Sequence, residues 1–186
     1  MQTLTDIGRP DLAWTVITQT TRPSLGYMLS KGATTIWERW DMDTRDPGMN
    51  SEALLIKAGN VDAWFYQTLA GINYDRDQPG FKHVLIRPQT LGDLTWVKAH
   101  HDCPYGRIVS NWKRDAGKLS MDVTIPANAT ATIYVPAKDA AGVTESGKPA
   151  ANADGVKFLR MDHGAAVYEV ASGVYHFRAG STKITH

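Results

Sequence analysis

The chain has 186 residues, a formal net charge of +1 at pH 7, and a composition that is 42% hydrophobic and 21% charged. This length suits one domain, or one domain and part of another, and the composition is ordinary for a globular protein. The near-neutral charge gives no electrostatic case for nucleic acid or an anionic membrane as a partner. No apolar run approaches the roughly 18 residues that a membrane span needs. The single cysteine, Cys103, excludes an internal disulfide and a multi-cysteine zinc site.

The N-terminal part of the chain has the apolar spacing of helices. Between residues 10 and 20 the apolar positions fall on one helical face, and Pro10 suits a first turn. A second helix is predicted over 60–72, because its apolar residues recur at intervals of three and four. Asn60 is suited to cap its start, and Gly71 lies where it should end.

After residue 75 the apolar period changes to two. In 119–125, apolar residues at the odd positions alternate with Ser120, Asp122 and Thr124, as in a half-buried strand. The same alternation runs through 130–135. Further strands are predicted at 82–87, 95–101, 108–113, 156–161, 166–170 and 174–178. The segment 137–154, rich in Ala, Gly and Asp, is predicted to be a long surface excursion.

About eight short strands with turns every 8 to 12 residues indicate an antiparallel β-sandwich. The fold class expected is therefore α+β multidomain, with N-terminal helices followed by an antiparallel β-sandwich. The helices occupy 1–75 and the sandwich occupies 76–186. The two or three helices cannot close a bundle of their own, so we expect their apolar faces to be covered by something else.

Two motifs suggest ligand sites that the surrounding sequence does not support. Residues 142–148 fit the start of a phosphate-binding loop, but Pro149 stands where the magnesium-binding hydroxyl belongs. His100 and His101 look like metal ligands, yet neighbours on a strand point to opposite faces, so the two cannot converge on one ion. A metal would need Asp102 and distant histidines, and we expect no metal site and no cofactor.

The segment 32–50 is the best candidate for a functional site. Glu38 lies between Trp37 and Trp40, and polar groups continue as far as Asn50. Indole faces suit the apolar faces of sugar rings, and a carboxylate among them can bind hydroxyls or move a proton. The structural alternative is that the tryptophans pack in a core while Glu38 pairs with Arg39 or another cation.

Several segments, in order along nearly the whole chain, resemble the C-terminal part of bacterial α-L-rhamnosidases. They are 26–40, 49–51, 61–67, 79–83, 105–108 and 123–128, the first of which contains Trp37-Glu38-Arg39-Trp40. The resemblance implies that 1–75 are the last helices of an (α/α)6 barrel and that 76–186 are the sandwich that follows it. Many relatives carry an Asn-His pair after Met-Asn-Ser, but here 52–57 contain no histidine, so none is carried over.

The resemblance also implies an activity, which is removal of terminal α-L-rhamnose from glycosides or polysaccharides with inversion at the anomeric carbon. Glu38 stands where the family places its general base, and Trp37, Trp40 and Asn50 would line the rhamnose pocket. The general acid comes from an earlier barrel helix, so the chain alone is expected to be inactive. The alternative function is a non-catalytic carbohydrate-binding or structural β-sandwich module.

A twelve-helix barrel needs several hundred residues, so the resemblance implies that this chain is a fragment, a clipped product or one piece of a larger assembly. Its exposed helical faces would then be covered by the upstream barrel or by a second copy of the chain. The first ten residues have neither a basic nor an apolar signal region. The resemblance leaves periplasmic, secreted and cytoplasmic locations open.

Overall fold

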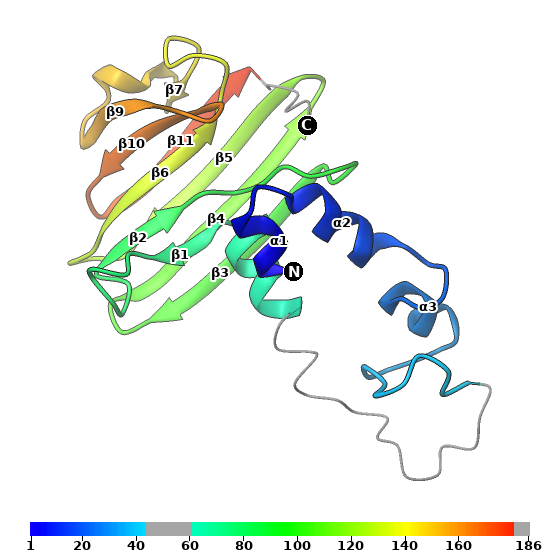
Figure 1. Cartoon of the computed structure of the whole chain (residues 1–186). Helices are drawn as coiled ribbons and strands as arrows, with labels where there is room; N and C mark the ends of the chain where they lie inside the picture. Colours follow the sequence, from blue (N-terminus) through cyan, green and yellow to red (C-terminus); the bar gives the residue numbers. More distant parts are fainter. Residues whose placement is uncertain (44–60, 181–186) are drawn as a thin grey trace. The chain divides into compact units, whose positions relative to one another are not determined.

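The structure, a computed structural model, describes residues 1–43 and 61–180. The chain divides into two compact units, Met1–Phe65 and Tyr66–His186, and each is described by itself. Figure 1 shows the helices of the first unit and the strands of the second. No helix in the described residues is long and apolar enough to cross a membrane.

The first unit contains three short helices, α1 (Gln2–Asp6), α2 (Pro10–Thr18) and α3 (Leu25–Ser30). The helix expected from residue 10 is confirmed, with Pro10 in its first turn and an extended Gln19 at its end. Residues 33–43 form turns rather than a helix, and a helical turn at 61–64 follows the gap. Trp64 is buried, and its indole Nε1 donates to Thr5 Oγ1 at 2.8 Å.

The second unit is a β-sandwich, as the alternating segments predicted. One sheet has the strand order β1-β2-β6-β10-β9, and the other has β3-β4-β5-β11-β7-β8. The first sheet contains β1 (Ile72–Tyr74), β2 (His83–Ile86), β6 (Thr130–Pro136), β9 (Val156–Asp162) and β10 (Ala165–Val170). The second contains β3 (Trp96–Cys103), β4 (Gly106–Asp115), β5 (Lys118–Ile125), β7 (Thr144–Glu145), β8 (Lys148–Pro149) and β11 (Gly173–Gly180).

Every predicted strand is present, but one pairing was not foreseen. Strands β2 and β6 run parallel, whereas the other strand pairs described are antiparallel. The chain crosses from one sheet to the other after β2 and returns at β6, so the two strands need no tight turn between them. The alternation of apolar residues predicts that a segment is a strand, but it does not predict whether two paired strands run parallel or antiparallel.

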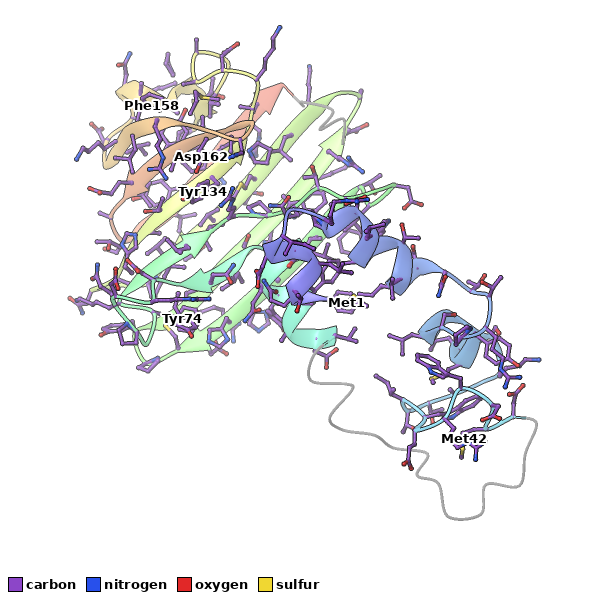
Figure 2. All side chains as sticks on the ribbon, viewed as in Figure 1. Met1, Met42, Tyr74, Tyr134, Phe158 and Asp162 are labelled. Atoms are coloured by element: carbon purple, nitrogen blue, oxygen red, sulfur yellow. The ribbon has the colours of Figure 1, made fainter. Side chains whose placement is uncertain are left out.

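The core lies between the inner faces of the two sheets. It includes Ile133 and Val135 from β6, Met121 from β5 and Phe177 from β11, all fully buried. In β5 the burial alternates residue by residue, as the sequence pattern of that strand predicted. Figure 2 shows Tyr134 and Phe158 on the five-stranded sheet, where Phe158 of β9 packs edge-on against Tyr168 of β10 at 5.7 Å.

Most residues of the segment 137–154 are exposed, as its composition predicted, but the segment is also anchored in the sandwich. Strand β7 pairs with β11, and a short 3-10 helix, η2 (Ala150–Asn152), follows β8. Val143 and Ala150 are completely buried in the sandwich core. These buried residues tie the segment to the sandwich, and its composition gave no sign of them.

The helix expected over 60–72 ends earlier than its apolar pattern suggested. After the turn at 61–64 the chain forms a π-helix, η1 (Phe65–Leu69), and Ile72 already begins β1. Asn60 lies outside the described residues. Leu69 and Ile72 are buried, while Phe65 is partly exposed. Most of the apolar stripe of 61–72 is therefore buried. Self-association of the chain stays a prediction, and the apolar side chains that could drive it are the exposed Ile7, Val16 and Leu29.

Side chains and backbone groups of the sandwich pair with the carbonyls at the end of η1. Trp112 Nε1 donates to Leu69 O at 2.8 Å, and Ser110 Oγ donates to Ala70 O at 2.7 Å. Both donors come from the inner face of β4. The last carbonyls of a helix have no partner within the helix, so these buried donors meet an obligatory requirement.

Gly71 makes the turn from η1 into β1 possible. Its φ is +74°, a left-handed conformation in which non-glycine residues are disfavoured. A Cβ built there would lie 2.2 Å from Pro88 N and 2.3 Å from Arg87 C, both of them backbone atoms. The backbone at Gly71 thus packs directly against Arg87 and Pro88, which leaves no room for a side chain at this position.

We predict that Gly71→Ala destabilises the chain by about 2–5 kcal/mol, which combines left-handed strain with overpacking. Gly117 has the same φ of +74° with nothing within 4 Å of a built Cβ, so Gly117→Ala is the matched control. The control should lose only about 1–2 kcal/mol. The free energy of unfolding from urea denaturation measures both. Equal losses in the two variants would show that the backbone near Pro88 moves to make room.

A second prediction concerns the buried tyrosines of the core. The hydroxyl of Tyr168 is buried with no hydrogen-bond partner among the described residues, and burial raises its pKa to about 12. Tyr175 OH donates to Ala171 O at 2.9 Å. Both rings stack on Phe177, at 5.5 and 6.1 Å.

We expect Tyr168→Phe to leave stability unchanged or to raise it, because an unpaired buried hydroxyl costs about 1–3 kcal/mol. Tyr175→Phe should instead lower stability by about 0.5–1.5 kcal/mol, the net worth of one hydrogen bond. Thermal unfolding of the two variants compares them directly. A destabilised Tyr168→Phe would mean that an ordered water pairs with the hydroxyl.

Candidate functional site

Local signals in the sequence set the start and the end of the helix that precedes the candidate site. Ser24 caps α3, since its Oγ accepts from Tyr27 N at 2.9 Å. At the other end Gly32 adopts φ +81°, Gly32 N donates to Leu29 O, and Ala33 N donates to Met28 O. This is a Schellman ending, which turns the chain sharply out of the helix. It sets the direction in which the loop carrying Glu38 leaves α3.

The far end of this loop is tied back to α3 by Asp43. Tyr27 OH donates to Asp43 Oδ2 at 2.7 Å, and Lys31 Nζ lies 3.7 Å from the same oxygen. The hydrogen bond to Asp43 raises the pKa of the Tyr27 phenol, and burial and the charge of Asp43 act in the same direction. Figure 2 marks Met42, the neighbour of Asp43, in this loop.

Asp41 joins the middle of the loop to residues before α3. Arg39 donates to both oxygens of Asp41, at 3.0 and 3.1 Å, and Arg22 Nη2 lies 3.6 Å from Oδ2. Sequence reasoning missed Arg22 and Tyr27 as partners, because nothing in their spacing marks them. It considered Arg39 as a partner of Glu38, and the structure gives Arg39 a two-pronged contact with Asp41.

The structure brings three of the four predicted site residues into this one loop. Trp37 is partly buried, Glu38 is exposed, and Trp40 is 38% exposed. Asn50 lies outside the described residues. The two indoles and the carboxylate therefore lie within four consecutive residues of one loop, and their roles in binding or catalysis stay predictions.

An apolar cavity of about 280 Å³ borders the same loop within the first unit. Thr34, Thr35 and Ile36 line it together with Met28 and Leu29 of α3, whereas Glu38 does not. None of its lining residues is a carboxylate. Within residues 33–43 and the helices described, the cavity supplies an apolar wall but no second acid.

The structure also places the two motifs that resembled ligand sites in the sequence. No group of three or more metal-ligating side chains occurs there. His101 packs on the Phe81 ring at 4.6 Å while His100 is exposed, so the prediction that the two point to opposite faces is confirmed. Lys148 of the phosphate-loop-like segment lies in β8, and the helix after it has only three residues.

Comparisons with known proteins connect both units to one family. Residues 1–69 match the model of the bacterial alpha-L-rhamnosidase 6 hairpin glycosidase domain, and residues 71–150 match that of the bacterial alpha-L-rhamnosidase C-terminal domain. The chain belongs to the bacterial α-L-rhamnosidase family, which confirms the resemblance read from the sequence. The predicted fold class, helices followed by a sandwich, is confirmed as well.

Relatives resemble the chain over nearly its whole length. An α-L-rhamnosidase of Streptomyces avermitilis is 33% identical over 94% of the chain, and one of Formosa agariphila is 28% identical over 96%. The chain spans 16% and 19% of their lengths. The solved S. avermitilis α-L-rhamnosidase, complexed with L-rhamnose, matches with a TM-score of 0.84 and 34% identity, over 95% of this chain and 16% of that one. The solved α-L-rhamnosidase from Dictyoglumus thermophilum matches with a TM-score of 0.83 and 33% identity, over 97% of this chain and 20% of that one.

Proposed function

We propose that this chain is the C-terminal segment of an α-L-rhamnosidase that cleaves terminal α-L-rhamnose from glycosides or polysaccharides with inversion. Glu38 is the general base, and Trp37 and Trp40 line the sugar pocket together with Asn50. The proposal also divides the chain into barrel helices up to about residue 75 and a sandwich from there on. Family membership and the arrangement of Glu38 between two indoles support it.

The chemistry asks Glu38 to take a proton from water. As that water attacks the anomeric carbon, the bond from this carbon to the aglycone oxygen breaks, and an acid protonates the departing oxygen. In an inverting site the two carboxyl groups lie roughly 6.5–9.5 Å apart, which leaves room for the water. Glu38 is exposed, as a base that meets incoming water must be before substrate binds.

The acid is proposed to come from a segment upstream of this chain. Asp41 and Asp43 accept hydrogen bonds or ion pairs from Arg39, Arg22, Tyr27 and Lys31. Carboxylates held in this way accept from neighbouring groups and fix the loop. Among the described residues of this loop, the proposal therefore has a base without an acid.

The test is Glu38→Gln in the complete protein. We expect kcat for an aryl α-L-rhamnoside to fall by roughly 10²–10⁴-fold, the usual worth of a positioned acid or base. Glu169→Gln is the matched control, since Glu169 is an exposed carboxylate on β10 whose nearest cation, Lys157, lies 3.9 Å away. The isolated 186-residue chain gives the background rate.

Near-normal turnover by Glu38→Gln would refute the role of Glu38. Release of rhamnose by the isolated chain at enzymatic rates would refute the assignment of the acid to an upstream segment. Failure of the complete protein to release rhamnose from any α-L-rhamnoside would refute the proposed activity itself.

A further inference from the structure

The outer face of the six-stranded sheet carries two ordered rows of polar side chains. The strand register places Trp96 of β3 beside Lys113 of β4, then Ser120 of β5 and Arg178 of β11. The next row along the strands is Lys98, Asn111, Asp122 and His176. Figure 1 shows β3, β4 and β5 running side by side across this sheet.

This face is hollowed along both rows. A cavity of about 480 Å³ is lined by members of both rows, from Trp96 at one end to Arg178 at the other. A second cavity of about 270 Å³ continues past His100 and Arg107. Lys98 and Asn111 line both, so the two hollows form one groove, which we call the outer groove. Its size suits two or three linked rings of a small ligand.

The outer groove offers an aromatic platform and oriented hydrogen-bonding groups. Trp96 is 57% exposed, so its indole face is accessible for stacking on a ligand ring. Asn111 Oδ1 accepts from Ala99 N at 3.1 Å, which fixes the amide. No described residue accepts from its Nδ2, so that group is left to donate to a ligand.

The charges of the groove are predominantly positive. Lys98, Lys113 and Arg178 line the larger cavity against a single carboxylate, Asp122. Asp122 is itself occupied, since Arg178 Nη1 and His176 Nδ1 each lie 3.0 Å from its Oδ1. Burial raises the pKa of Asp122, but these hydrogen bonds outweigh it and leave the pKa below its ordinary value. Lys113 also lies 3.7 Å from the exposed Asp115.

We propose that the outer groove binds an oligosaccharide that carries carboxylate groups, that is, a uronate-bearing chain. Trp96 stacks on one ring, Asn111 donates to a hydroxyl, and Lys98 with Lys113 attracts the carboxylates. A saccharide fits better than a polyphosphate, because the indole and the fixed amide complement a ring with hydroxyls. A neutral saccharide would leave the excess positive charge without a partner. This binding does not depend on Glu38 or on rhamnoside hydrolysis.

The test is calorimetric titration of the chain with a linear galacturonate trimer, compared with the neutral galactose trimer. We expect the acidic trimer to bind at least about tenfold more tightly, and its affinity to fall as salt is raised. Trp96→Ala should weaken binding about tenfold or more, and Lys98→Ala should remove most of the preference for the acidic trimer. Lys157→Ala, the same change on β9 of the other sheet, is the matched control and should bind like the parent chain.

Three results would overturn the proposal. These are equal binding of the two trimers, unchanged binding in Trp96→Ala, and weakening by Lys157→Ala as strong as that by Lys98→Ala. Circular dichroism checks the fold of each variant, and Lys98→Ala with the salt series decides the matter should Trp96→Ala fail to fold. No binding of either trimer would also refute it, whatever the rhamnosidase assay gives.

Discussion

Five consecutive carbonyls at the end of η1, from Gln67 to Gly71, are the constraint on which the second unit is built. Asn73 Nδ2 donates to the first, Gln89 N to the second and Arg87 N to the last. Trp112 and Ser110 pair with the two between them. A helix end buried without partners would cost about 1–3 kcal/mol for each orphan carbonyl. The donors come from three separate segments, so the helix end has all its partners only when β1, the residues after β2, and β4 are in place.

The loop that carries Glu38 follows the same principle on a smaller scale. Residues 33–43 of this loop form no helix or strand, so the course of the loop is set by the Schellman ending at Gly32 and by the ion pairs of Asp41 and Asp43. A base must be held in place to be effective, and these contacts act close to Glu38 in the sequence. Asp41 and Asp43 belong to the polar run that the sequence offered for sugar binding. In the structure their carboxylates hold the loop in place.

The elements with a clear period were predictable from the sequence. Burial on one face forces alternation, so the strands near Met121 and Ile133 were located to within one or two residues. Partners distant in sequence were not: nothing local links Trp112 to Leu69 or Tyr27 to Asp43. The parallel β2–β6 pair and the buried anchors Val143 and Ala150 within 137–154 were missed for the same reason. The domain boundary after residue 75 and the roles of Glu38, Trp37, Trp40 and Asn50 stay predictions.

The central claim is that Glu38 activates the attacking water, and chemical rescue tests it most directly. In the Glu38→Ala variant of the complete protein, azide can attack the anomeric carbon without a base, while the upstream acid still protonates the departing oxygen. The account predicts that azide restores turnover of an aryl α-L-rhamnoside and yields the β-configured rhamnosyl azide. It also predicts no effect of azide on the parent rate. An unrescued variant, or an azide product of retained configuration, would contradict it.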